Sequence, residues 1–192
     1  MKLLTFSDLI PLALPGFGNA WIFMAYHFLP MPIIWITGIG GTGDVGESKG
    51  RQRNIGPWIP WIALYLLSIF TPLRTGSLWF RAGIPSVIIG LALYTSVNYS
   101  FLKSRAGERI ITGGLYRFSR HPMYVTGAIF LAGMCLVTAS VPFLLLSLIV
   151  TIRPFRSAGA EEVYCTLKHG EEYRRYVSRT PRWIGVPGKN KR

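Results

Sequence analysis

Residues 122–152, PMYVTGAIFLAGMCLVTASVPFLLLSLIVTI, form a stretch of 31 residues without a single charged side chain. About 20 apolar helical residues cross a hydrocarbon core of roughly 30 Å, so this stretch is too long for one crossing. Near its middle, Ala139-Ser140-Val141-Pro142 joins small residues to a proline, which is typical of a tight turn. The stretch therefore predicts a helical hairpin with spans over 122–139 and 142–154.

Three further segments are long and apolar enough to be spans, at about 16–40, 57–72 and 82–102. Half of the 192 residues are hydrophobic and 15% are charged, whereas soluble domains carry about 25% charged residues. Gly83 and Gly90 lie seven residues apart on one face of the third span, as is typical where membrane helices pack closely. The sequence predicts an all-α integral membrane protein with about five transmembrane helices.

The basic residues predict the orientation, because Lys and Arg accumulate in cytoplasmic loops near span ends. With the N-terminus outside, the segments 41–56, 103–121 and 153–192 are cytoplasmic and hold 18 of the 21 basic residues. A four-span chain, in which 122–152 crosses once, places the basic C-terminal tail outside and is rejected. We expect a multi-pass protein with a cytoplasmic C-terminus.

The net charge of +13 raises the question of nucleic acid, since basic patches commonly neutralise phosphates. Here the charges flank the spans, where they satisfy the orientation rule and attract anionic lipid. We therefore expect membrane lipid as a partner and no nucleic acid. Cys135 and Cys165 show no pattern typical of a metal site.

The C-terminal half, 103–192, carries most of the motifs, while 1–102 holds the first three spans, and we expect one structural domain. Residues 161–176, EEVYCTLKHGEEYRRY, place Val163, Tyr164 and Leu167 at helical spacing. This pattern predicts a cytoplasmic amphipathic helix that caps the spans, with Gly170 as a candidate break.

Charged residues at span ends are costly to desolvate, and so they are functional candidates. Pro122 suits the first turn of a helix, which places the residues before it at a helix N-terminus that favours anionic groups. Three clusters meet at the cytoplasmic end of the hairpin: Arg120 with His121, Arg153 with Arg156, and Glu161 with Glu162.

A site with cations on one side and carboxylates on the other suits a zwitterionic ligand that has an amino-acid moiety and a ribose. Two alternatives remain open from the residues themselves. Arg120 and His121 also suit a simple interfacial anchor, and the Arg and Glu side chains also suit a salt bridge.

The order of these motifs resembles the isoprenylcysteine carboxyl methyltransferase family and the related phospholipid methyltransferases. The resemblance covers roughly 105–185. It is carried by Gly114-x-Tyr116, Arg120-His121-Pro122-x-Tyr124-x-x-Gly127, Gly133, Glu161-Glu162, Leu167, Gly170, Tyr173, Tyr176 and Pro181-Arg182.

The resemblance implies a membrane methyltransferase that uses S-adenosyl-L-methionine and acts on a lipophilic or lipid-linked acceptor similar to an isoprenylcysteine carboxylate. Arg156 and Arg153 are the implied substrate-side catalytic residues, and no metal is implied. The implied cofactor pocket is lined by Glu108, Arg109, Ile110, Ile111, Tyr116, Arg120, His121, Pro122, Met123, Tyr124, Glu161 and Glu162.

Two other functions stay open. Membrane sterol reductases, which use NADPH, share an Arg-His-Pro-x-Tyr element, and Cys165, Lys168 and Gly170 are similar to their tail. A non-catalytic membrane scaffold is the other alternative. The methyl acceptor and the oligomeric state are not identified by the sequence.

Overall fold

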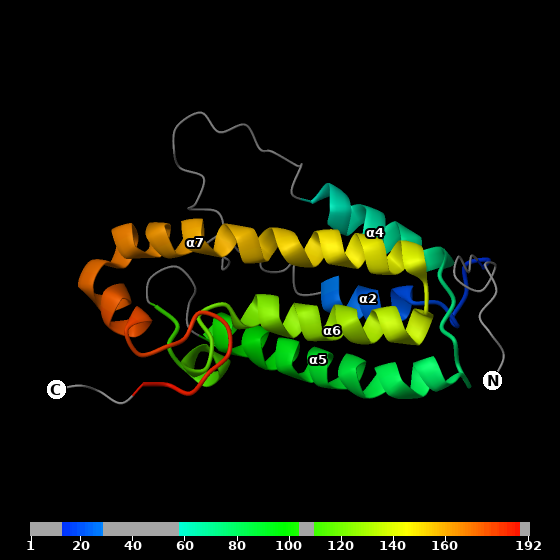
Figure 1. The fold of residues 1–192 in the computed structure, drawn as a ribbon, viewed down its shortest axis with the longest axis horizontal. Coiled ribbons are helices and arrows are strands. Elements are labelled where there is room, and N and C mark those ends of the chain that lie inside the picture. The colour runs from blue at the N-terminus through cyan, green and yellow to red at the C-terminus, as the bar shows by residue number, and fades with distance from the viewer. Residues whose placement is uncertain (1–12, 29–57, 104–109, 189–192) are drawn as a thin grey trace.

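The computed structural model describes residues 13–28, 58–103 and 110–188. This part of the chain is helical, and its β-structure is limited to one isolated bridge between Asn19 and Pro72. Figure 1 shows an elongated bundle in which α5, α6 and α7 run side by side. The elements are α2 (Trp21–Phe28), α4 (Ile59–Phe70), α5 (Leu78–Lys103), a 3-10 turn η2 (Gly114–Arg117), α6 (Pro122–Thr138) and α7 (Val141–Val177).

The predicted hairpin is confirmed. The α6 helix ends at Thr138, and Ala139 adopts a left-handed conformation with φ of 45°. Ser140 then caps α7 by accepting a hydrogen bond from the Phe143 N–H at 3.4 Å. Pro142 follows in the first turn, where no N–H is needed.

Close packing of α5 against α6 fixes their antiparallel register. A Cβ added to Gly83 would lie 2.8 Å from the carbonyl oxygen of Gly133, and one added to Gly90 would lie 2.7 Å from the backbone of Phe130. Ser86 also donates to the carbonyl of Ile129 at 2.9 Å. The prediction that Gly83 and Gly90 serve close helix packing is confirmed.

The C-terminal helix differs from the prediction. We expected a span to end near residue 154 and a separate amphipathic helix to begin at 161, but α7 is continuous through both segments. Pro154 lies inside the helix without ending it. The helix changes direction at Gly170, whose φ of 54° and ψ of −127° are readily adopted only by glycine. Apolar character ends near Ile152, but helicity does not.

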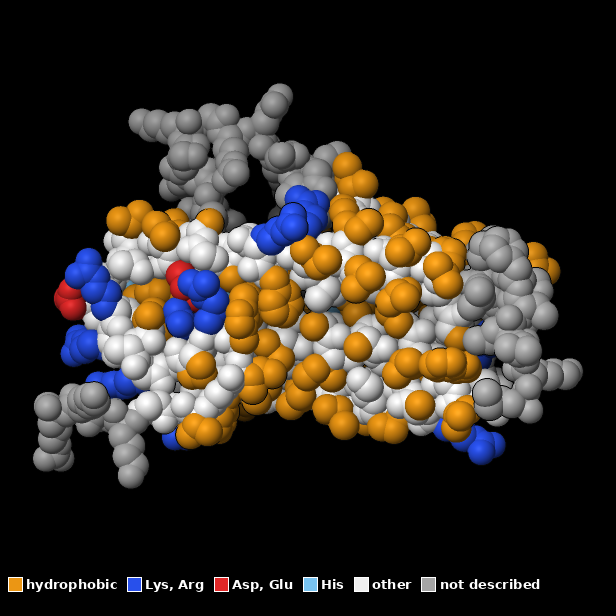
Figure 2. All heavy atoms as spheres, viewed as in Figure 1, with side chains coloured by type: hydrophobic (Ala, Val, Ile, Leu, Met, Phe, Trp, Pro, Cys, Tyr) orange, Lys and Arg blue, Asp and Glu red, His pale blue; other side chains and the backbone are white. Residues whose placement is uncertain are grey.

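The span prediction is supported in part. Within the described residues, α5 over Leu78–Ser100 and α7 are long and apolar enough to cross a membrane, whereas α4 and α6 are shorter apolar helices. Of the first predicted span, the described part contains α2. Figure 2 shows hydrophobic side chains along the bundle, and most of the basic side chains in this view lie toward the end where α7 changes direction. Exposed apolar residues include Ile62, Leu66, Ile88, Ile89, Leu145 and Leu148.

The α5–α6 contact predicts that alanine substitutions at two glycines have different effects on stability. A Cβ at Gly133 would lie 2.6 Å from the backbone nitrogen of Val87, so Gly133→Ala forces the helices apart and should cost about 1–3 kcal/mol. A Cβ at Gly159 on α7 meets nothing within 4 Å. Thermal unfolding in detergent should show a lowered Tm for Gly133→Ala and an unchanged or higher one for Gly159→Ala. Equal Tm values would contradict this packing.

Candidate active site

The site is built at the N-terminus of α6. His121 is the N-cap residue, and its backbone N–H donates to the Ser119 hydroxyl at 3.1 Å. Pro122 occupies the first turn as predicted. Because a proline has no N–H to satisfy, the helix begins here without a further cap. The chain just before the helix thereby holds Arg120 and His121 at the end of the bundle.

The segment after α7 folds back over this helix start and fixes it. The backbone N–H of Arg120 donates to the carbonyl of Pro181 at 3.0 Å, and the N–H of Gly185 donates to the carbonyl of Phe118 at 3.1 Å. Within α7, the Tyr176 hydroxyl donates to the carbonyl of Tyr116 at 2.7 Å. The C-terminal segment 178–188 is therefore part of the site.

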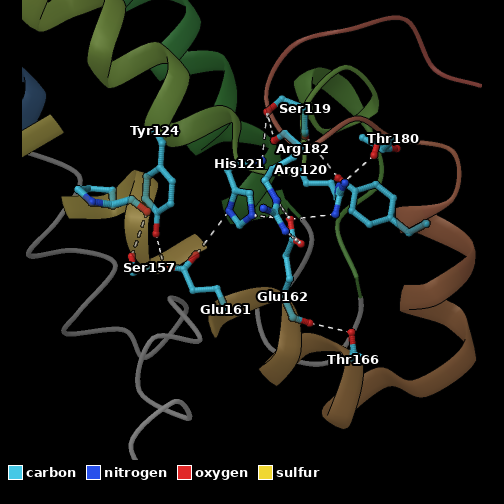
Figure 3. A network of polar contacts seen from close by, with 12 residues as sticks. Ser119, Arg120, His121, Tyr124, Ser157, Glu161, Glu162, Thr166, Thr180 and Arg182 are labelled. Atoms are coloured by element: carbon cyan, nitrogen blue, oxygen red, sulfur yellow. Dashed lines mark hydrogen bonds and ion pairs between the residues drawn. The ribbon is translucent and has the colours of Figure 1, made fainter. Parts of the chain in front are cut away.

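The paired carboxylates approach His121 from two sides (Figure 3). Nε2 of the ring lies 3.2 Å from Glu162 Oε1, and Nδ1 lies 3.5 Å from Glu161 Oε2. The Tyr124 hydroxyl donates to the other oxygen of Glu161. His121 therefore links the two carboxylates at the start of α6.

Glu162 is also held by two arginines. Arg120 NH1 lies 2.9 Å from Oε1, while Arg182 makes a two-pronged contact, with Nε 3.0 Å from Oε1 and NH2 2.6 Å from Oε2. The Glu162 side chain is 12% exposed, and Arg120 also donates from Nε to the carbonyl of Thr180 at 2.9 Å. The salt bridge that the sequence left open as an alternative is therefore present.

These contacts stabilise the charged form of the carboxylates. Burial of Glu162 favours its neutral form, but hydrogen bonds from Arg182 and His121 and the charge of Arg120 outweigh burial and lower its pKa. For Glu161, burial is likewise outweighed by hydrogen bonds from His121 and Tyr124, and its pKa is also lowered. The cluster thus keeps two carboxylates ionised at neutral pH.

Aromatic rings surround the polar cluster. The rings of His121 and Tyr124 are nearly parallel, with centroids 5.4 Å apart. Trp183, on the C-terminal segment, has its ring centroid 5.6 Å from that of His121. Trp183 also packs on Phe155 of α7 at 4.3 Å. Flat apolar surfaces therefore lie directly beside charged groups.

The structure brings together five of the residues expected from the sequence: Arg120, His121, Tyr124, Glu161 and Glu162. The backbone of Tyr116 joins the cluster through Tyr176, and burial raises the pKa of the Tyr116 hydroxyl. Met123 and the Ile110-Ile111 pair are half-buried, while Arg153 and Arg156 are exposed on α7. Glu108 and Arg109 lie outside the described residues.

The sequence reasoning missed the contribution of the C-terminal segment. Arg182 and Trp183 were not among the expected site residues, although Pro181-Arg182 was part of the motif order. The sequence signal for these residues was an Arg-Trp pair directly after Pro181. It carried no distance information, because only the reversal of the chain after α7 brings these residues to His121.

Two apolar helices long enough to cross a bilayer, with a charged cluster at one end of the bundle, indicate membrane association. Residues 84–169 match the family model described as PEMT, Phospholipid methyltransferase. The match confirms the resemblance to this methyltransferase family and supports a membrane methyltransferase. No curated protein and no solved structure gave a significant match.

The lowered pKa of Glu162 predicts a pH-dependent stability. A carboxyl with a folded pKa below its unfolded value of about 4.3 stabilises the fold above that value, and the contribution disappears as pH falls through the folded pKa. Chemical unfolding between about pH 6 and pH 3 should therefore show a smaller loss of stability for Glu162→Gln than for the parent protein. Part of the pH dependence of stability should remain in Glu162→Gln, because the pKa of Glu161 is also lowered.

Glu171 supplies the matched control. It pairs with Arg174 at 2.6 Å, but its side chain is 72% exposed. Glu171→Gln should reproduce the parental pH profile, because an exposed pair contributes little. A parental profile for Glu162→Gln would contradict the electrostatic role given to the cluster.

Proposed function

We propose that this protein is an S-adenosylmethionine-dependent methyltransferase that acts from the membrane on a lipophilic or lipid-linked acceptor. The observation that carries the proposal is His121, held between two ionised carboxylates at the N-terminus of α6 inside the segment that matches the methyltransferase family. We further propose the five-span arrangement with a cytoplasmic C-terminus, supported by the distribution of the basic residues.

The residues present fit the cofactor. Arginine and histidine side chains suit its carboxylate, and ionised glutamates suit its ammonium or ribose hydroxyls. Tyr124 and Trp183 offer ring faces for its adenine. When bound, S-adenosylmethionine supplies a methyl group activated on a positively charged sulfur.

Binding requires an exchange of ionic partners at Glu162. Arg120 is 14% exposed and is tied to the carbonyl of Thr180, whereas Arg182 is 46% exposed and lies on the C-terminal segment. Arg182 is therefore the cation best able to leave Glu162 and meet the ligand carboxylate. Arg120 keeps the charge of Glu162 compensated during the exchange.

The chain's contribution to the reaction is to position and desolvate. His121 and Tyr124 fix the orientation of the carboxylates, and the C-terminal segment covers the site against water. Holding two reactants in line contributes about 7–11 kcal/mol to lowering a barrier, so positioning accounts for a large part of the catalysis. Arg153 and Arg156, which are exposed on α7, remain the proposed substrate anchors.

Calorimetry on the detergent-purified protein tests the proposal with S-adenosylmethionine, S-adenosylhomocysteine and NADPH. We expect saturable binding of the first two ligands. Glu162→Ala should weaken their affinity at least about tenfold, since a charged hydrogen bond contributes about 1.5–3 kcal/mol. Glu171→Ala is the control and should bind as the parent does. Binding of NADPH alone would favour a reductase, and no binding by a folded sample would favour a scaffold.

The roles of His121 and Arg156 are separable by the same measurement. His121→Ala should weaken binding of S-adenosylhomocysteine by at least about tenfold, because it removes the group that orients both carboxylates. Arg156→Ala should bind the cofactor product normally, because Arg156 is assigned to the acceptor. Equal weakening in both variants would contradict the division between cofactor and acceptor sides.

A further inference from the structure

Three polar side chains lie buried in the bundle, inward from the charged cluster. His27 on α2 is 2% exposed, and Tyr94 and Asn98 on α5 are 2% and 5% exposed. Tyr94 and Asn98 are four residues apart and so share one helix face. The imidazole of His27 stacks on the ring of Tyr94, with centroids 4.1 Å apart, which joins the three residues into one group.

Each of these side chains has a polar atom without a hydrogen-bond partner among the described residues. These atoms are Nδ1 of His27, the hydroxyl of Tyr94 and Oδ1 of Asn98. The amide orientation of Asn98 is fixed, because its Nδ2 donates to the carbonyl of Tyr94 at 2.8 Å. Burying an unsatisfied polar group costs about 1–3 kcal/mol, so three together call for a binding partner.

The imidazole of His27 is held rigidly. Its ring lies 4.8 Å from that of Phe130 and 5.8 Å from that of Trp61, both stacked. Packing by itself would be served as well by a phenylalanine, which has no polar atom to bury. Packing therefore does not account for a histidine at this position. The stacked rings instead hold its polar ring nitrogen in a fixed orientation.

The helix register places this group beside the candidate active site. Gly83 packs opposite Val137 and Gly90 opposite Phe130, so Tyr94 lies near the level of Thr126 and Asn98 near that of Pro122. Gly127, one turn after Tyr124, packs against His27, because a Cβ on it would lie 3.9 Å from Cε1 of the His27 ring. The group thus extends inward from the start of α6, where the charged cluster lies.

We propose that His27, Tyr94 and Asn98 form the subsite that binds the polar head of the methyl acceptor. This inference rests on the proposed function and narrows its substrate class. Asn98 Oδ1 only accepts hydrogen bonds, the Tyr94 hydroxyl donates and accepts, and His27 Nδ1 does either according to its tautomer. A head with N–H or O–H groups satisfies all three atoms.

A carboxylate fits the subsite poorly. It has no hydrogen to donate to Asn98 Oδ1, whereas an ammonium or a hydroxyl head donates to that oxygen. The subsite therefore favours amine or hydroxyl heads on a lipophilic chain over the isoprenylcysteine-type carboxylate that the family resemblance implies.

The experiment uses the three histidines of the chain as reporters. Protein labelled with ¹⁵N-histidine is titrated in micelles with decylamine, decanol and decanoate, which share one chain and differ in the head. We expect decylamine and decanol to shift the His27 ring signals saturably, and decanoate to bind at least about tenfold more weakly. Tenfold corresponds to about 1.4 kcal/mol, within the range of about 0.5–1.5 kcal/mol for one typical hydrogen bond.

Asn98→Leu and Tyr94→Phe remove the unpartnered atoms and should weaken decylamine binding at least about tenfold while the Tm stays level or rises. The control is Tyr26→Phe, which removes a hydroxyl from the exposed contact with Thr95 at 3.0 Å and should bind normally. An unshifted His27, an equal response to the three heads, or an equal effect of Tyr26→Phe would overturn the subsite.

The same samples distinguish failure of the proposed function from failure of the acceptor subsite. S-adenosylhomocysteine should shift the signals of His121 and leave the affinity for decylamine within about threefold of its value without the nucleoside, a difference below 1 kcal/mol. A silent His121 with a responsive His27 would refute the cofactor assignment and retain a polar lipid site.

Discussion

The imidazole of His121 between the carboxylates of Glu161 and Glu162 is the contact on which the end of the bundle depends. It joins the N-cap residue of α6 to the middle of α7, and Glu162 extends the network to Arg120 and Arg182. A buried carboxylate without a partner is strongly destabilising, so each member of the cluster constrains the others. The cluster thereby fixes the relative depth of α6 and α7 as well as the chemistry of the site.

Patterns that depend on neighbouring residues were predicted well. The turn at Ala139-Ser140, the first-turn position of Pro122 and the packing faces of Gly83 and Gly90 follow from local rules of helix geometry. The convergence of Arg120, His121, Glu161 and Glu162 followed from one topological step, the hairpin. In each of these cases, the contact depends on local helix rules or on a single turn of the chain.

The errors concern features that local sequence patterns do not determine. Hydropathy ends near Ile152, and the boundary of the span was taken for the boundary of the helix, although α7 continues to Gly170 and resumes beyond it. Arg182 reaches Glu162 only because the chain reverses after α7, which no periodicity records. His27, Tyr94 and Asn98 carry no motif. Their significance lies in buried atoms that lack partners, and this is visible only in three dimensions.

The fold back of segment 178–188 has a consequence for the biosynthesis of the protein. Arg182 and Trp183 leave the ribosome after every helix of the described bundle has been made, so synthesis of the helices and assembly of the site are successive events. Until the segment docks, Glu162 lacks its two-pronged partner, and the helix start at Arg120 lacks the backbone bonds that hold it. The charged centre is therefore completed only after the helices of the described bundle have been made.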